Sequence, residues 1–347
     1  MANTTLLGSS KSIFLAAVLS CGLVSAQSSL SLASKIVASA NGFLSSLDEG
    51  QRSKVLFEFN DAAQRMKWSN LPTTMVPRAG LKMGDLSGPQ RKAAMGLLAA
   101  TLSKRGYEKV LAIVEGDEVL RAASGGGGSM FGRDLFYISI LGKPSVKDPW
   151  MFQFGGHHLA LNITMVGLDG ILTPSLTAAQ PAKYTVDGKT VRPLGAENDK
   201  AFALINALDE GQRKQAILNY KVADLVLGPG RDGKTIQPEG IKCSAMNASQ
   251  QAMLLELVGE WAGIINEQAA AARMAEIKAN LSGTWFAWSG PTTNGMPAYY
   301  RIQGPTLVIE YAPQPLGGDP TMHIHTIYRD PTNDYGKKSV DHRVSSQ

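Results

Sequence analysis

Four of the five histidines of this chain fall into two short segments. His157 and His158 are adjacent in Gly-Gly-His-His-Leu-Ala-Leu-Asn, and His323 and His325 are separated by one residue in Met-His-Ile-His-Thr-Ile-Tyr. Because residues two apart in a strand point to the same side, His323 and His325 can present two imidazoles to one ion. The pattern indicates a metal site, and histidines that only hydrogen-bond in the core or at an interface are the alternative.

If His157 and His158 also lie within a strand, they point to opposite sides of it. His158 then shares a side with Asn162, and Glu310 is expected on the equivalent polar side of a similar strand. Imidazole and carboxylate ligands suit a divalent metal, Zn or else Fe, Cu or Mn. The candidate metal ligands are therefore His157, His158, His323 and His325, and Glu310 is a candidate ligand or general base.

A polar segment rich in turn-forming residues, Arg329–Gly336, follows the second pair of histidines. It is typical either of a loop that binds an anionic or sugar-like group or of a structural Arg–Asp turn. With Glu310, we take Arg329 and Asp330 as candidate catalytic residues. A nearby aromatic cluster is interpreted as core or as a platform that stacks on sugars: Trp285, Trp288, Tyr299 and Tyr300.

The chain repeats itself in three blocks that keep their order. Residues 47–52 recur letter for letter as 208–213, and Gly80-Leu81-Lys82 resembles Gly240-Ile241-Lys242. Ser87 and Asn247 follow at equivalent places, and each is a good first cap for a helix with apolar residues at helical spacing. A strand region closes each unit, with a hairpin joined at 142–149 in one and 290–297 in the other. Matched blocks in one order favour a duplication.

These elements predict an α+β protein built from two divergent tandem repeats, each with helices first and strands second, packed about a pseudo-twofold axis. We expect a signal peptide over 1–26, a first repeat unit over 27–170, a connector over 171–202 and a second unit over 203–347. Sites often form where such units meet.

The N-terminus predicts export. Lys11 precedes an apolar run from Ile13 to Val24, which is too short to span a bilayer, and Val24-Ser25-Ala26 offers small residues for cleavage. The mature protein is expected to be secreted or periplasmic, without stable membrane insertion, although Cys21 leaves a lipoprotein as the alternative. Cleavage leaves Cys243 alone, so the mature chain can form no internal disulfide.

The composition argues against a nucleic-acid partner. Lys and Arg exceed Asp and Glu by five, but the surplus is spread along the chain, and no run of like charges appears. The glycine run 125–128 lacks the Lys and Ser/Thr of a phosphate-binding loop, and we expect no nucleotide cofactor.

The histidine segments and the strands around them resemble a known family. Trp150–Asn162, Tyr299–Glu310, His323–Gly336 and the stretch from Arg78 to Arg91 resemble the secreted proteins catalogued as domain of unknown function three-thousand-five-hundred. The resemblance implies an architecture and a candidate site but no reaction. By resemblance, the seven site candidates named above fall on the family's motif positions. This chain departs from the family at Ala312-Pro313, where Asp-Asn is usual after Glu-Tyr.

Two classes of function remain open. One is a metal-dependent extracytoplasmic enzyme, with hydrolysis favoured over redox chemistry because water is always available to an exported enzyme. The other is a non-catalytic protein whose histidines and aromatic residues line a pocket for a small molecule or a glycan.

Overall fold

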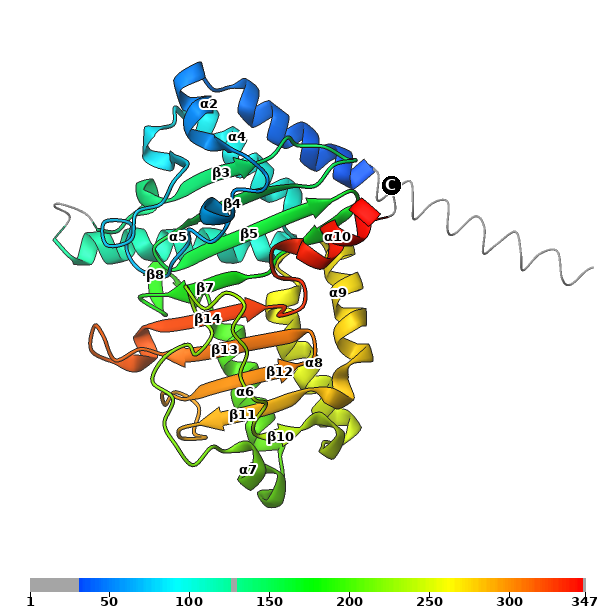
Figure 1. The fold of residues 1–347 in the computed structure, drawn as a ribbon. Helices are drawn as coiled ribbons and strands as arrows, with labels where there is room; N and C mark the ends of the chain where they lie inside the picture. Colours follow the sequence, from blue (N-terminus) through cyan, green and yellow to red (C-terminus); the bar gives the residue numbers. More distant parts are fainter. Residues whose placement is uncertain (1–30, 126–129, 346–347) are drawn as a thin grey trace, which may run out of the picture.

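The computed structural model describes residues 31–125 and 130–345. The expected signal segment 1–26, with Cys21, lies outside this part of the chain. The fold is a mixed α+β arrangement organised by one large sheet, with helices packed behind it and long loops in front (Figure 1). Among the described residues, no helix has the length and apolar character needed to cross a membrane.

The large sheet has twelve strands, and its main path runs β1-β3-β4-β5-β7-β14-β13-β12-β11-β10. All neighbours are antiparallel except β1 and β3, which makes the sheet mixed. β2 pairs with β3, β6 pairs with β5, and β8 and β9 form a separate hairpin. The strands are β1 (Leu56–Phe57), β2 (Leu81–Lys82), β3 (Tyr137–Leu141), β4 (Trp150–Gly156), β5 (Leu159–Val166), β6 (Asp169–Ile171), β7 (Ser175–Ala179), β8 (Tyr184–Val186), β9 (Lys189–Val191), β10 (Ile241–Lys242), β11 (Trp285–Ser289), β12 (Tyr299–Gly304), β13 (Leu307–Pro313) and β14 (Ile324–Arg329).

The helices begin where the sequence offers caps. Ser87 and Asn247 cap helices as predicted, each in a reciprocal capping box with a glutamine three residues on. Asp48 and Asp209, in the two copies of the matching hexapeptide, form the same box. The helices are a helix through residues 31–45, α2 (Glu49–Val55), α3 (Ala62–Arg65), α4 (Gly88–Thr101), α5 (Lys104–Ala123), α6 (Gly195–Ala207), α7 (Glu210–Ala216), α8 (Ala248–Ala262), α9 (Glu267–Ala279) and α10 (Lys337–Ser345).

The two faces of the sheet differ in character. On the helix side, aliphatic and aromatic residues such as Leu161 and Ile309 are fully buried in two clusters under the helices. On the opposite side, buried polar residues bind the segments that cross the sheet: Gln153 binds Gln64 of α3, and Glu310 binds Leu227 of a long loop (Figure 1). Because buried polar groups need partners, the loop layer is held by specific hydrogen bonds rather than by apolar packing alone.

The segment 171–202, expected as a connector, contributes a central strand. β7 pairs with β5 on one side and with β14 on the other, so it joins the earlier and later strands into one sheet. Thr177 of β7 and Thr326 of β14 lie opposite each other, with hydroxyl oxygens 2.8 Å apart. The prolines and glycines around β7 suggested a linker, and a fully buried strand only five residues long is a weak sequence signal.

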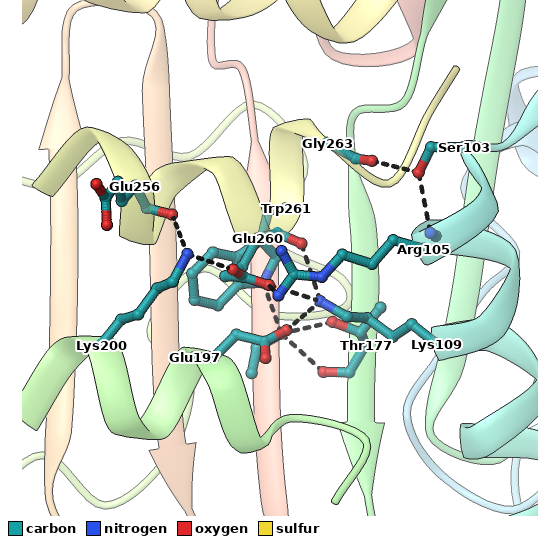
Figure 2. Close-up of polar contacts among 12 residues, drawn as sticks. Ser103, Arg105, Lys109, Thr177, Glu197, Lys200, Glu256, Glu260, Trp261 and Gly263 are labelled. Carbon is teal, nitrogen blue, oxygen red and sulfur yellow. Dashed lines mark hydrogen bonds and ion pairs between the residues drawn. The ribbon is translucent and has the colours of Figure 1, made fainter. Parts of the chain in front are cut away.

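A buried ionic cluster lies in the helix layer (Figure 2). The Lys109 ammonium of α5 contacts the carboxylate of Glu197 in α6, and it lies 3.7 Å from a carboxylate oxygen of Glu260 in α8. Arg105 and Lys200 reach Glu260 from the rim. Burial raises the pKa of Glu197, against the opposing effect of Lys109. The cluster therefore ties three helices together around two carboxylates and one buried ammonium.

Candidate functional site: a buried group of three histidines

Three histidines from two separate segments meet on the loop side of the sheet. His325 lies in β14, His323 directly precedes it, and His158 lies in the turn between β4 and β5. The Nε2 atom of His323 lies 3.0 Å from Nε2 of His158 and 3.1 Å from Nε2 of His325. All three side chains are buried. The prediction that His158, His323 and His325 converge is confirmed by this geometry.

The prediction that His157 and His158 lie within a strand is wrong. They form the two-residue turn that joins β4 to β5, and His158 has a left-handed backbone with φ of 63°. The His158 N–H donates to the Asn70 carbonyl at 3.2 Å, and its own carbonyl accepts from the Ala178 N–H at 2.8 Å. These bonds hold an unfavourable conformation in place, and such conformations concentrate at functional sites.

In His323 and His325 the Nε2 atoms face each other and the Nδ1 atoms face other partners. The partner of each Nδ1 determines whether the Nε2 of the same ring carries a lone pair. Nδ1 of His323 lies 2.7 Å from the Leu316 carbonyl oxygen, which can only accept, so this nitrogen carries the proton. Nδ1 of His325 lies 3.2 Å from Oδ1 of Asp224, which favours the same tautomer. With the proton of each ring on Nδ1, the two Nε2 atoms that face each other carry the lone pairs. Burial lowers the pKa of His323 to about 4, so this ring is neutral near pH 7.

The same group fits a metal ion. Zn–N bonds of about 2.0–2.1 Å at tetrahedral angles place two ligand nitrogens roughly 3.3–3.4 Å apart. The three ligand atoms of His158, His323 and His325 lie within 4.8 Å of one another, with two of the spacings close to that value. Burial, with the neighbouring imidazoles adding to it, holds the pKa of His158 well below its usual range. Three imidazoles with converging ring nitrogens could hold a metal ion.

His157 points elsewhere. Its Nδ1 lies 2.6 Å from Oδ1 of the buried Asp117 in α5, and its ring stacks on His158 with centroids 3.6 Å apart. His157 therefore lies outside the three-histidine group and contacts the ring of one member, His158. The group that could hold a metal ion does not include His157, which was predicted as a ligand; its ring packs against that of His158 instead.

Two residues beside His325 carry no local sequence signal. Asp224, from the loop between α7 and β10, contacts Nδ1 of His325 through Oδ1, and the same oxygen accepts from Gln314 at 2.8 Å. Its side chain is 52% exposed, so it also faces solvent. Asn70 lies 3.4 Å from both ring nitrogens of His325. An isolated Asp or Asn in a long loop cannot be distinguished from an ordinary turn residue by pattern.

Glu310 does not join the histidines. Its two carboxylate oxygens accept from the backbone N–H groups of Val226 and Leu227, at 2.9 and 2.7 Å, and from the Tyr299 hydroxyl at 2.6 Å. It is fully buried. The structure therefore uses this carboxylate to fix the loop that follows Asp224.

Arg329 and Asp330 also make structural contacts. Arg329 donates to the carbonyls of Leu227 and Gly228 and pairs with Asp232 and Asp334, while Asp330 pairs with Arg273 at 2.9 Å. Both residues are buried. These contacts match the alternative in which the segment is a structural turn, and they place Arg329 beside Glu310 as an anchor of the same loop.

The departure from the family pattern lies next to the histidines. Ala312 is the direct cross-strand partner of His325 in the β13–β14 pair. A carboxylate at this position would lie beside the imidazole, because paired residues share a side of the sheet. In this chain Asp224 supplies the carboxylate beside His325 from the loop instead.

A cavity of about 550 Å³ is lined by residues that neighbour Asp224 and Gln314 in the chain. Ala223 lines it directly before Asp224, and Pro313 and Pro315 line it on either side of Gln314. Tyr220, Tyr299 and three further prolines complete most of its apolar surface. Lys221 is the one charged residue among its lining residues. Such a cavity suits a largely apolar small molecule.

The fold and the site together define an α+β protein with a buried three-histidine group on the loop side of a single large sheet. The chain belongs to the DUF3500 family, described as "Protein of unknown function", whose model matches residues 30–337. No curated protein and no solved structure matches the chain.

Proposed function

We propose that this protein is an exported, metal-dependent enzyme whose ion is held by His158, His323 and His325. The observation that carries the proposal is the contact of His323 and His325 through Nε2 atoms 3.1 Å apart, while each Nδ1 faces an oxygen acceptor. Two lone pairs that face each other repel, and a cation between them removes that cost. Zn²⁺ suits three imidazoles best, and Fe, Cu or Mn is the second choice.

Hydrolysis is the reaction class that we favour. An ion bound by three protein ligands keeps a position for water, lowers the pKa of that water and polarises a substrate oxygen. Asp224 is the carboxylate placed to accept a proton nearby. Its Oδ1 makes the contacts to His325, Gln314 and the Leu225 N–H, and within the described residues Oδ2 is left to solvent. The 550 Å³ cavity is the proposed place for the apolar part of the substrate.

A non-catalytic binding protein is the second candidate. The cavity supports it, because its walls are apolar and its size suits a small molecule whether or not a metal is present. In that case the three histidines would stabilise the loop side of the sheet, with or without an ion.

Metal analysis of protein purified without a histidine tag tests the proposal. We expect about one ion per chain in the wild type, loss of the ion in His325→Ala, and retention in the matched control His342→Ala, which changes an exposed histidine of α10. Leu161→Ala should do the reverse, keeping the ion while lowering the free energy of unfolding by about 2–5 kcal/mol. Wild-type protein that takes up no ion, or His325→Ala that retains it, would exclude the site.

Export is part of the proposal. It is supported by the short apolar run Ile13–Val24 and the small residues that follow it. Intact-mass measurement of protein from the export compartment should give a mature chain that begins near Gln27. An uncleaved N-terminus, or a lipid on Cys21, would contradict it.

We further infer that the two halves of the chain arose by duplication. Supporting details recur in both: Gln90 bonds Gln51 near the start of α4, and Gln250 bonds Gln212 near the start of α8. Gly80 and Gly240 both adopt positive φ, where an added Cβ would strike the backbone carbonyl of the neighbouring strand. Superposition of 137–161 on 285–309 by an experimental structure would test the inference, and unrelated positions in the two halves would contradict it.

A further inference from the structure

A second cavity, of about 490 Å³, lies at the other end of β14 from the histidines. Arg329, the last residue of β14, lines it together with α3, the loop around Lys234 and the start of α10. None of the three clustered histidines lines it. The cavity is therefore a site separate from the proposed metal centre.

The cavity carries an excess of positive charge. Its lining includes four basic and two acidic side chains: Arg65, Lys234, Arg329 and Lys337 against Asp232 and Asp334. Nη1 of Arg329 lies 3.2 Å from Asp232 and 3.0 Å from Asp334, and Asp232 also accepts from the Tyr335 hydroxyl at 2.6 Å. Both carboxylates are thus already paired within the fold.

The other three cations lack carboxylate partners among the described residues. Arg65 donates to the Phe59 carbonyl through Nη2, but its buried Nε has no hydrogen-bond partner there. The ammonium groups of Lys234 and Lys337 are exposed, and no ion pair within residues 31–125 and 130–345 involves them. Unpaired cations around one concave surface attract an anion, and a buried donor without a partner carries a free-energy cost that an anion relieves.

The loop that carries Lys234 matches the residue pattern of a phosphate-binding loop. Gly228–Thr235 reads Gly-Pro-Gly-Arg-Asp-Gly-Lys-Thr, which has the letters of a phosphate-binding loop. It neither follows a strand nor opens a helix, so it is not the strand–loop–helix unit that hydrolyses nucleotides. Gly230 and Gly233 have positive φ and turn the backbone, so that residues 232–235 line the cavity consecutively.

We propose that this cavity binds a small organic phosphate monoester. Its phosphoryl group would face Arg65, Lys234 and Lys337, because a dianion matches the unpaired charge. Its organic part would lie against apolar walls such as Met66 and Pro331. The proposal is independent of the metal centre and goes beyond the proposed function.

Isothermal titration with phenyl phosphate on chelator-treated full-length protein tests the proposal, because removing metal excludes phosphate bound at the histidines. We expect saturable binding that weakens with salt and that weakens about tenfold, or about 1.4 kcal/mol, in Lys234→Gln. Lys337→Gln should weaken phenyl phosphate binding to a similar extent. Lys221→Gln, which changes an exposed lysine of the same long loop at the other cavity, should bind as the wild type does.

Inorganic phosphate and benzyl alcohol complete the design. Weaker binding of inorganic phosphate and none of the alcohol would support a ligand with both an anionic and an apolar part. Equal affinity for inorganic phosphate would overturn the monoester assignment in favour of a simple anion. Absence of phenyl phosphate binding, or equal binding by Lys234→Gln and the wild type, would overturn the site itself.

Discussion

At the scale of single residues, the histidine site depends on which nitrogen of each ring carries the proton. Leu316 and Asp224 lie opposite the outer nitrogens of His323 and His325, so they direct the lone pairs inward. Such outer partners raise the affinity of a ring for metal and fix its orientation. The main-chain partner cannot be removed by substitution, but the side-chain partner can.

Asp224→Asn should therefore weaken metal binding without unfolding the protein. The amide can present its N–H₂ to Nδ1 of His325, which would favour the tautomer with the proton on Nε2 and remove a ligand lone pair. We expect about a 10–100-fold loss of affinity, measured by competition with a coloured chelator. Asp319→Asn, which changes an exposed Asp before η5 (Pro320–Met322), is the control. Equal affinity in both variants would show that Asp224 does not direct the tautomer.

The sequence predicted the histidine group better than its surroundings. The His-X-His spacing brought His323 and His325 together, because the extended backbone from His323 into β14 points both rings to one side. Glu310 was taken as a site residue because it was expected on the polar side of its strand, and Arg329 because it opens a polar segment. Both instead bind a loop on this side of the sheet. Asp224 and Asn70 could not be predicted, because loops bring them to the site over long separations in the chain.

At the scale of elements, the loop between α7 and β10 is held by side chains of the sheet. Glu310 of β13 accepts from N–H groups of Val226 and Leu227, and Arg329 of β14 donates to the carbonyls of Leu227 and Gly228. The two side chains thus fix consecutive peptides shortly after Asp224. Residues 218–223 of the same loop line one cavity and residues 232–235 line the other, so the anchored peptides lie between these two segments in the chain.

Glu310→Gln should loosen this loop. The amide would oppose one of the backbone N–H groups with its own donor, and hydrogen bonds to a charged acceptor are worth about 1.5–3 kcal/mol. We expect faster proteolytic cleavage within 218–240 and weaker metal binding, with the sheet intact by circular dichroism. Glu256→Gln, at an exposed position of α8, should change neither. Unchanged cleavage in Glu310→Gln would mean that other contacts hold the loop.

The order of elements was more predictable than their exact conformation. Helix caps at Ser87 and Asn247 and both hairpins follow from local sequence, because capping and turn chemistry act over a few residues. The turn at His157–His158 was missed because bulky residues rarely adopt positive φ. The central place of β7 was missed because strand pairing is a long-range property.

At the scale of the whole molecule, the ionic cluster of Figure 2 connects helices from both parts of the chain. Lys109 comes from α5, whereas Glu197 and Glu260 come from α6 and α8. The two acidic groups differ in their partners, because Glu260 also pairs with Arg105 and Lys200, whereas the ion pair of Glu197 is with Lys109. Glu197 has a raised pKa and a carboxylate oxygen without a hydrogen-bond partner among the described residues.

Lys109→Gln should therefore cost much more than Glu197→Gln. Loss of the lysine leaves the buried carboxylate of Glu197 without a cation, whereas Glu260 keeps Arg105 and Lys200. We expect this change to lower the free energy of unfolding by about 3–5 kcal/mol. Glu197→Gln leaves Lys109 near Glu260 and retains an acceptor, for a change of about 1 kcal/mol or less. Lys200→Gln, at the partly exposed rim, should cost little. Chemical denaturation at pH 7 measures all three, and equal losses would refute the unequal sharing.

The pH dependence has a defined sign. Because the folded pKa of Glu197 is raised, its ionised form opposes folding at pH above that value, and the opposition disappears as pH falls to the unfolded value near 4.5. The wild type should therefore gain stability relative to Glu197→Gln as the pH is lowered from 7 towards 4.5. A difference that stays constant over this range would show that Glu197 is not perturbed in the folded state.

The pairing of β7 with β14 has a consequence for fragments of the chain. The outer strands of the sheet, β1 and β10, are only two residues long, whereas the central pair joins five residues of β7 to β14. A chain cut between β9 and α6 would leave β7 in one piece and β14 in the other, each with one unpaired edge. Exposed strand edges of this kind pair readily with other chains. Co-expressed pieces should reassemble through β7 and β14, and a piece expressed alone should pair with its own copies, as in domain swapping.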